Sequence, residues 1–149
     1  MGCKFSSLKN ATLDNTPLWS LNNQIHYVKV LKVYDGDTIW IAIRINFIIY
    51  KLKVRLFGID TPEMKPPKSQ PDREQEKAKA REAKQFVETI ILNKHIRLHV
   101  DGMDKYGRWL VRVACPDTGS DLGEMLLAQG HAYRYDGGTK QAFSEYSVI

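Results

Sequence analysis

The chain has 149 residues, of which 43% are hydrophobic and 26% are charged. This composition is typical of one globular domain and is too apolar for a disordered chain. Lys and Arg number 22 against 17 Asp and Glu, so the net charge of +5 suits an anionic partner such as nucleic acid or an acidic membrane surface. The two cysteines exclude a disulfide framework and a cysteine-based zinc site. Apolar runs such as residues 47–50 are far shorter than the ~20 residues that span a bilayer.

Residues 1–24 are polar, aperiodic and rich in Ser, Asn and Thr, so we expect a leader outside the fold, with residues 25–149 forming the domain. The leader lacks the apolar stretch of a secretory signal, which predicts an intracellular protein. Its start matches the myristoylation pattern M-G-x-x-x-[ST], which predicts acylation at Gly2 and a second acyl chain on Cys3. Two acyl chains would associate the protein with a membrane, whereas a single acyl chain binds a membrane only weakly. The alternative is a chance match in a disordered tail.

Residues 25–57 show the period-two alternation of β-strands. The apolar positions on either side of a D-G-D-T segment at residues 35–38 are Val28, Val30, Val33, Ile39, Ile41, Ile43 and Ile45. The strand that follows has two faces, with Leu52, Val54 and Leu56 on one and Lys51, Lys53 and Arg55 on the other. This segment therefore predicts several short strands in succession.

Residues 58–71, rich in Pro and Lys, predict a loop before a long helix. Ser69 and Asp72 bracket Pro71 in a start that resembles a capping box. Apolar residues then recur at helical spacing, at positions 83, 86, 87, 90 and 91. We interpret the charged run over residues 72–84 as the solvated face of this helix.

A hairpin and short helices complete the predicted domain. Residues 96–100 and 109–113 alternate around a turn at residues 101–107. A short helix is expected from Asp121 or Leu122 to Gln129, with Ser120 or Asp121 as its cap and Gly130 at its end. Residues 139–149 predict a short final helix. Several short strands with one long helix favour an α+β domain built on a small closed barrel.

The first candidate site is the D-G-D-T segment. Residues two apart in an extended chain project to one face, so the carboxylates of Asp35 and Asp37 can converge. Close carboxylates repel, and a hard cation with oxygen ligands, Ca²⁺ or Mg²⁺, stabilises them. The alternative is an ordinary Asp-Gly turn.

A second candidate group lies at the end of the next strand. Arg55 can reach a phosphate oxygen with a bidentate fork. Asp60 and Glu63 flank Thr61 and Pro62, and the proline restricts the backbone of Thr61. The alternative is a solvated strand face followed by a turn.

Two further segments interleave cations with aromatic rings. Lys105, Tyr106 and Arg108 suit one nucleotide, because they offer phosphate contacts and a ring on which a base stacks. Tyr133 and Tyr135 lie on either side of an arginine in a similar pattern, although packing against the barrel would also explain them.

Together, D-G-D-T at residues 35–38, R-x4-D-T-P-E at residues 55–63 and D-K-Y-G-R at residues 104–108 resemble the staphylococcal nuclease (thermonuclease-like) family. The resemblance covers about residues 25–143, in the family's order of elements. It implies a five-stranded OB-like barrel flanked by one long helix and short C-terminal helices. It also implies Ca²⁺-dependent hydrolysis of phosphodiesters in DNA and/or RNA, leaving 3′-phosphate and 5′-hydroxyl ends. We expect a monomer.

Carried onto matching positions, the resemblance implies a metal site and a base. Asp37, Asp60 and the backbone carbonyl of Thr61 would ligate Ca²⁺. Asp35 would contact the metal indirectly, through a bound water. Glu63 would orient, and also deprotonate, the attacking water.

The resemblance also implies a phosphate site and a nucleotide site. Arg55 and Arg108 would hold the scissile phosphate and offset the charge that builds as it becomes five-coordinate. Lys105 and Tyr106 match positions that contact the terminal phosphate of a bound nucleotide. Tyr133 or Tyr135 would lie near the base, and the two are not distinguished.

The chain departs from the family pattern after Gly137-Gly138, where too few residues remain for the family's long final helix. The loop after Glu63 also adds Pro66-Pro67. Four histidines match no catalytic pattern and are interpreted as structural or surface residues: His26, His95, His99 and His131. Two other functions remain open. One is a non-catalytic module of the same fold that binds nucleic acid or protein, and the other is a membrane-tethered adaptor that acts through its acylated leader.

Overall fold

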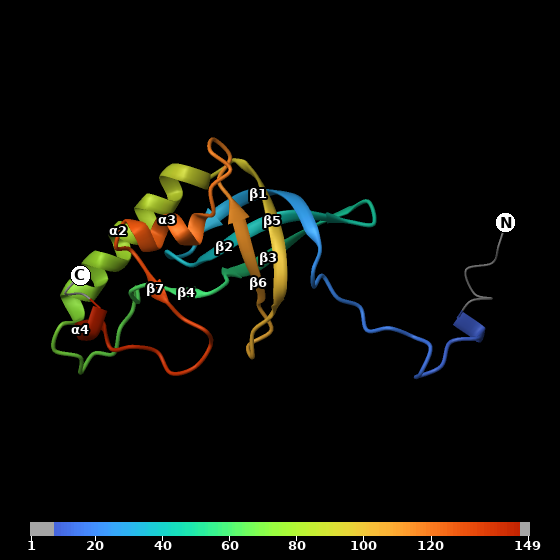
Figure 1. The fold of residues 1–149 in the computed structure, drawn as a ribbon, viewed down its shortest axis with the longest axis horizontal. Helices are drawn as coiled ribbons and strands as arrows, with labels where there is room; N and C mark the ends of the chain where they lie inside the picture. The colour runs from blue at the N-terminus through green and yellow to red at the C-terminus, as the bar shows by residue number, and fades with distance from the viewer. Residues whose placement is uncertain (1–7, 147–149) are drawn as a thin grey trace.

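A computed structural model describes residues 8–146 and contains a closed five-stranded β-barrel (Figure 1). Its strands are β1 (Ile25–Val33), β2 (Thr38–Ile45), β3 (Ile48–Leu56), β5 (His95–Met103) and β6 (Trp109–Ala114). They follow the order β1-β2-β3-β6-β5, and all neighbours are antiparallel except β3 and β6. Helices α2 (Arg73–Ile91), α3 (Leu122–Ala128) and α4 (Phe143–Tyr146) gather at one end of the barrel. The predicted α+β fold with a small closed barrel is confirmed.

Alternation of side chains closes the barrel around one apolar core. Ile39, Ile41 and Ile43 of β2 are each 1% exposed, whereas Arg44 is exposed, because successive strand residues point to opposite faces. The first half of β1 pairs with β5 and its second half with β2, and a register shift between Val30 and Lys32 interrupts the pairing with β2. The helices complete the core with Val87, Ile91, Leu122 and Leu126.

The two main helices begin differently. Asp121 caps α3 as predicted, since its side chain accepts a hydrogen bond from the Glu124 N–H at 2.9 Å. Asp72 precedes α2 but makes no side-chain cap hydrogen bond, so the predicted capping box is wrong. Its φ of −96° and ψ of 21° are not the extended values from which a cap side chain turns back to the first N–H groups. Glu74 and Glu76 instead place negative charge in the first turn.

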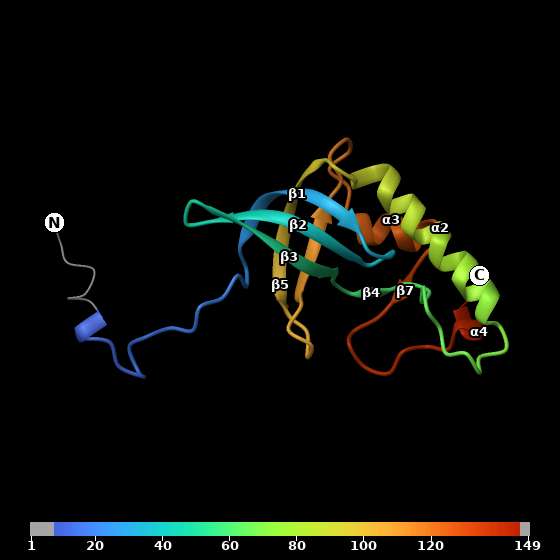
Figure 2. The ribbon, with the colours of Figure 1, turned by 180° about the vertical axis from the view of Figure 1, so that it is seen from behind.

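The segment predicted as a loop over residues 58–71 contains a short strand, β4 (Ile59–Asp60). It pairs antiparallel with β7 (Tyr133–Arg134), so that Asp60 lies opposite Tyr133. Two residues are too few for alternation to reveal a strand. This pairing brings the C-terminal part of the chain back to the end of β3, and the chain then runs to α4 beside α2 (Figure 2). The final helix predicted over residues 139–149 is shorter than expected: residues 139–142 are not helical, α4 covers Phe143–Tyr146, and residues 147–149 lie outside the described residues.

Residues just before β1 also contact the barrel. Leu21 is 3% exposed within the core, and the ring of Trp19 meets that of Trp109 edge-on, with centroids 6.3 Å apart. The chain before them runs away from the barrel on the side toward which the β2–β3 hairpin projects, as both ribbon views show. Gly2 and Cys3 lie outside the described residues, so their acylation stays a prediction. Among residues 8–146, no helix is long and apolar enough to cross a membrane.

Candidate functional site

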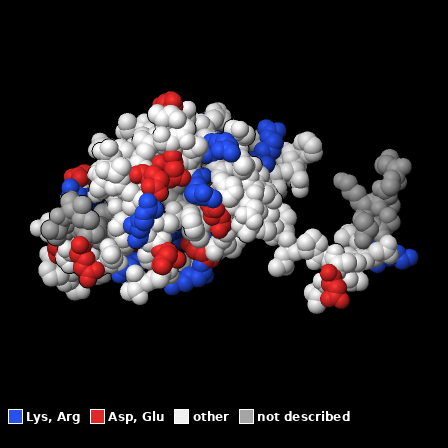
Figure 3. All heavy atoms as spheres, in the orientation of Figure 1, with Lys and Arg blue, Asp and Glu red and all other residues white. Residues whose placement is uncertain are grey.

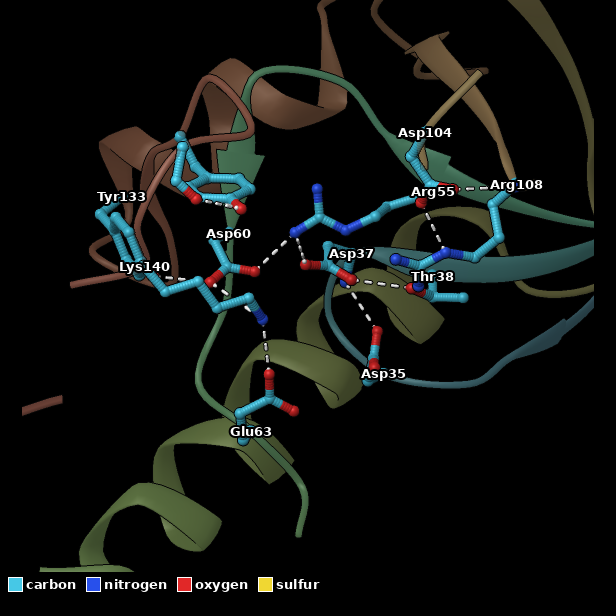
Figure 4. A network of polar contacts seen from close by, with 12 residues as sticks. Asp35, Asp37, Thr38, Arg55, Asp60, Glu63, Asp104, Arg108, Tyr133 and Lys140 are labelled. Atoms are coloured by element: carbon cyan, nitrogen blue, oxygen red, sulfur yellow. Dashed lines mark hydrogen bonds and ion pairs between the residues drawn. The ribbon is translucent and has the colours of Figure 1, made fainter. Parts of the chain in front are cut away.

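Three acidic and basic side chains converge where β2 begins and β3 ends. The strand register sets Thr38 opposite Arg55, and β4 follows a short turn later. Arg55 Nη2 donates to Asp37 Oδ2 at 3.0 Å and to Asp60 Oδ1 at 2.6 Å (Figure 4). None of the three side chains is more than 8% exposed. We call Asp37, Arg55 and Asp60 the buried network; it unites two motifs that the sequence keeps apart.

The turn that carries Asp35 and Asp37 depends on Gly36. Asp35 Oδ1 accepts a hydrogen bond from the Asp37 N–H at 3.1 Å. A Cβ at Gly36 would lie 2.9 Å from Cβ of Ala83 in α2 and 2.9 Å from Cγ2 of Thr61, too close for carbon atoms. Only glycine therefore lets this turn pack against both α2 and Thr61, which is itself buried. The same packing brings Asp37 and the Thr61 backbone into one region.

The buried network contains excess negative charge. Burial, followed by the charge of Asp35, raises the pKa of Asp37 well above its ordinary value of 3.8, and Arg55 opposes this only in part. Burial acts to lower the pKa of Arg55, but the charges of Asp37 and Asp60 outweigh it and raise that pKa. The guanidinium therefore stays charged. A buried carboxylate with a raised pKa gains from any cation that approaches it.

Glu63 lies beyond β4 and contacts a lysine that the sequence analysis did not identify. Lys140 Nζ lies 2.7 Å from Glu63 Oε1 and 3.4 Å from Asp60 Oδ2 (Figure 4). Burial acts to lower the pKa of Lys140, but its hydrogen bond to Glu63 and the charge of Asp60 raise it overall. Lys140 is 77 residues from Glu63 along the chain and lies in no motif. No sequence pattern connects the two.

Glu76 of α2 is a second residue that the sequence analysis did not identify. It is 5% exposed, and its Oε1 accepts a hydrogen bond from the Glu63 N–H at 2.8 Å, while its other oxygen accepts one from the Gln70 side chain. The interpretation of residues 72–84 as a solvated face is therefore wrong at this position. A signal was present, because Glu76 lies seven residues before Ala83 and so on the buried face of the helix.

The turn between β5 and β6 positions Arg108. Asp104 accepts hydrogen bonds from the N–H groups of Tyr106 and Arg108, both at 2.9 Å, and from Arg108 Nε at 2.7 Å. Burial acts to raise the pKa of Asp104, but these donors outweigh it and lower that pKa. Tyr106 is 72% exposed, and its ring centroid lies 5.2 Å from Lys105 Nζ. Figure 4 shows Arg108 on the far side of Arg55 from Lys140.

The two tyrosines proposed to face a base occupy different environments. Tyr133 is 8% exposed, and its hydroxyl donates to Asp60 Oδ2 at 2.6 Å. Tyr135 has its ring centroid 5.4 Å from Arg55 Cζ and, with Lys105, lines a hollow of about 250 Å³ beside Arg55. This geometry favours Tyr135 as the ring near a nucleotide and gives Tyr133 the task of holding Asp60.

The side chains fit a hard cation in chemistry. All the acidic groups near the buried network offer oxygen, the donor that Ca²⁺ prefers, and four carboxylates (Asp35, Asp37, Asp60 and Glu63) face two cations, Arg55 and Lys140. In the described part of the chain, however, no three His, Cys, Asp or Glu side chains are grouped closely enough to hold a metal ion. Arg55 instead bridges Asp37 and Asp60. Metal binding therefore requires these carboxylates to exchange some of their contacts with Arg55.

The barrel, its helices and this acidic and basic site define a nuclease-like α+β domain, and comparison with known proteins identifies the family. Residues 53–148 match the family described as staphylococcal nuclease homologue. The chain belongs to this family, which confirms the resemblance inferred from its motifs.

Similar proteins come from distant organisms. An uncharacterized protein of Methanocaldococcus jannaschii is 30% identical over 160 aligned residues, which cover 90% of this chain and 75% of that protein. An uncharacterized endonuclease of Haemophilus influenzae is 30% identical over 120 residues, or 80% of this chain and 58% of that protein. A probable staphylococcal-like nuclease of Oryza sativa subsp. japonica is 27% identical over 85 residues, or 57% of this chain and 19% of that protein. The chain thus spans less than two thirds of the latter two.

Proposed function

We propose that this protein is a Ca²⁺-dependent nuclease that hydrolyses phosphodiester bonds of DNA and/or RNA and leaves 3′-phosphate and 5′-hydroxyl ends. The observation that carries the proposal is the buried network, in which an acidic pair lies directly against a guanidinium. A module that only binds nucleic acid needs cations for the phosphates, and buried carboxylates would repel the polymer. Family membership supports the same reaction.

In the proposed reaction, residues of the chain hold the phosphate, orient a water and accept a proton. Arg55 and Arg108 direct fixed positive charge at the phosphoryl oxygens, whose negative charge grows as phosphorus becomes five-coordinate. Glu63 accepts a proton from the attacking water while the water oxygen bonds to phosphorus. The bond from phosphorus to the 5′ oxygen breaks, and that oxygen takes a proton from solvent. Lys140 and the contact from Glu76 to the backbone fix the position of Glu63.

The proposed Ca²⁺ ligands are Asp37, Asp60 and the Thr61 carbonyl, with Asp35 supporting them through a water. Bound Ca²⁺ would supply positive charge that polarises the phosphoryl group. Tyr133 holds Asp60 from behind, and a raised pKa at Asp37 favours cation binding. Asp37 and Asp60 gain the most from a cation because their side chains are buried.

The remaining assignments concern the substrate and the leader. We propose that Lys105 and Tyr106 contact the terminal phosphate of a bound nucleotide and that Tyr135 packs near its base. We also propose that acylation at Gly2 and Cys3 places a monomeric intracellular enzyme at a membrane. The hollow lined by Arg55, Lys105 and Tyr135 supports the nucleotide assignment.

Digestion of single-stranded DNA and of RNA, each with Ca²⁺ or with EDTA, tests the reaction. We expect cleavage by the wild type with Ca²⁺ alone, none by Asp37→Ala, and products that a kinase labels at the 5′ end without prior dephosphorylation. Glu63→Gln should lose about 10²–10³-fold in rate while nucleotide binding persists. Glu74→Gln, which makes the same change on the surface of α2, serves as the matched control. Absent cleavage would instead support the non-catalytic binding module, and metal-independent cleavage would overturn the Ca²⁺ dependence.

A further inference from the structure

The β2–β3 hairpin carries a row of cations and aromatic rings outside the proposed active site. Directly opposed residues of an antiparallel pair point to the same side, and the register opposes Thr38 to Arg55, Trp40 to Lys53 and Ala42 to Lys51. These positions lie on the outside of the barrel, because the alternate residues, such as Ile39 and Ile41, are buried. We call Tyr34, Trp40, Arg44, Lys51 and Lys53 the hairpin face.

Within the hairpin face, the two lysines contact the two aromatic rings. Lys53 Nζ lies 4.0 Å from the ring centroid of Tyr34 and 5.8 Å from that of Trp40. Lys51 Nζ lies 5.5 Å from the Trp40 centroid. Tyr34 is 44% exposed, so part of its ring is open to solvent. Cations and rings therefore alternate along one face of β3, which extends about 13 Å, at 3.2–3.4 Å per residue, from the buried Arg55 to the exposed Lys51.

In the part of the chain that the structure describes, the cations of the hairpin face have no carboxylate partner. Among residues 8–146, no ion pair forms to Arg44, Lys51 or Lys53, whereas Lys77, Lys79 and Lys84 of α2 each pair with a glutamate. Figure 3 shows Lys and Arg interspersed with Asp and Glu over the body of the domain, and a basic group without an acidic neighbour over the projecting hairpin. Three cations of this face, Arg44, Lys51 and Lys53, are therefore not offset by an acidic partner among residues 8–146.

We infer that the hairpin face is a binding track for single-stranded nucleic acid, continuous with the phosphate site at Arg55. Unpaired lysines attract successive phosphates, and the partly exposed aromatic rings between them stack unpaired bases. A duplex would not offer its bases to Tyr34 and Trp40. The inference rests on the proposed function, and it adds that the substrate is a single strand held at several nucleotides rather than at one.

The tip of the same hairpin suggests a competing partner, a lipid surface. Phe47 is 92% exposed and Ile48 is 55% exposed. The tip, however, lies beyond the track, and the rings of Tyr34 and Trp40 are held against lysines along the strands rather than at the tip. Continuity with Arg55 on β3 favours the nucleic acid.

Binding of fluorescent oligothymidylate to the full-length chain in EDTA tests the track without any cleavage. Lys51→Gln/Lys53→Gln removes two phosphate contacts, which should lower the slope of log affinity against log salt by about 1.4 and weaken binding about 20-fold near 0.1 M salt. Lys79→Gln/Lys84→Gln makes the same charge change on α2 and should retain the wild-type slope. Tyr34→Leu should weaken oligothymidylate binding about tenfold but leave binding of inorganic polyphosphate unchanged, since polyphosphate has no bases.

Two results would overturn the inference. One is equal affinity and equal slope in the two lysine double variants. The other is a loss of binding to phosphatidylserine vesicles in Lys51→Gln/Lys53→Gln without a loss of oligothymidylate binding, which would assign the face to a membrane. Failure of the nuclease assay leaves these measurements intact, because they are made in EDTA.

Discussion

The buried network and the surface of α2 contain ion pairs of similar length in opposite environments. Arg55 lies 3.0 Å from Asp37, and both side chains are 8% exposed, whereas Lys79 lies 3.1 Å from Glu82, and both are 53% exposed. Water screens the second pair, and such pairs contribute little to stability. The first pair is removed from water, so each charge depends on its partners. Burial, and not distance, decides which of these pairs can do chemistry.

Removing Arg55, the cation that Asp37 and Asp60 share, is the most direct test of the difference between the buried network and the exposed pairs of α2. Arg55→Met leaves Asp37 and Asp60 buried without their partner, so we expect a loss of about 3–5 kcal/mol in the free energy of unfolding and a rate loss of at least about 10²-fold. Urea denaturation in EDTA measures the first effect and digestion of single-stranded DNA the second. A stability loss below about 1 kcal/mol would mean that the network behaves like the surface pairs.

The packing that supports the network should be the next most sensitive feature. Gly36→Ala places a Cβ 2.9 Å from both Ala83 and Thr61, which we expect to cost about 1–3 kcal/mol, as overpacking of a core does. Thermal unfolding measures this change. Gly119→Ala, at a position where an added Cβ meets nothing within 4 Å but φ is 72°, separates the cost of a strained backbone from that of packing. A smaller loss at Gly36 than at Gly119 would contradict the packing role.

Neutralising Asp37 should raise the stability of the protein, whereas removing Arg55 should lower it. Because its folded-state pKa is raised, ionised Asp37 destabilises the fold once pH rises above the ordinary value of 3.8. We expect Asp37→Asn to stabilise the protein in EDTA at neutral pH by about 0.5–2 kcal/mol, the usual range for one stabilising substitution. The gain should shrink as pH falls toward 3.8. Urea midpoints at several pH values test this, and a gain that grows on acidification would refute it.

The smallest effect is expected on α2. Lys79→Met removes the exposed pair with Glu82 and should change the free energy of unfolding by less than about 0.5 kcal/mol. The same urea titration measures it, with Lys65→Met, outside the helix, as a control. A loss comparable with that of Arg55→Met would show that exposure does not separate the two regions.

Much of the fold followed from local pattern. The alternation at Ile39, Ile41 and Ile43 predicted a strand with one buried face, and the structure buries those residues. The sequence predicted Ser120 or Asp121 as the cap of α3, and the structure shows Asp121 in that role. The two-residue strands β4 and β7 were not predictable, since pairing between distant segments leaves no periodicity in either.

The candidate site also contains residues that the sequence predicted and residues that it did not. Asp37, Arg55 and Asp60 lie in motifs, and the strand register that opposes Thr38 to Arg55 brings them together. The helical spacing of Glu76 indicated a buried position, although its charge favoured a solvated one. No sequence pattern indicated the position of Lys140, because its contacts with Glu63 and Asp60 depend on the path of the chain after β7.

By itself, the sequence determined the family, the strands and the residue types of the site, because these depend on spacing within short segments. Only the tertiary structure decided which charges are buried and which remain in water. The tertiary structure bonds the Tyr133 hydroxyl to Asp60 and places the Tyr135 ring beside Arg55, although in the sequence the two tyrosines flank the same arginine. The physical reason is that desolvation depends on everything that surrounds a charge, and neighbours in space are not recorded in the order of the chain.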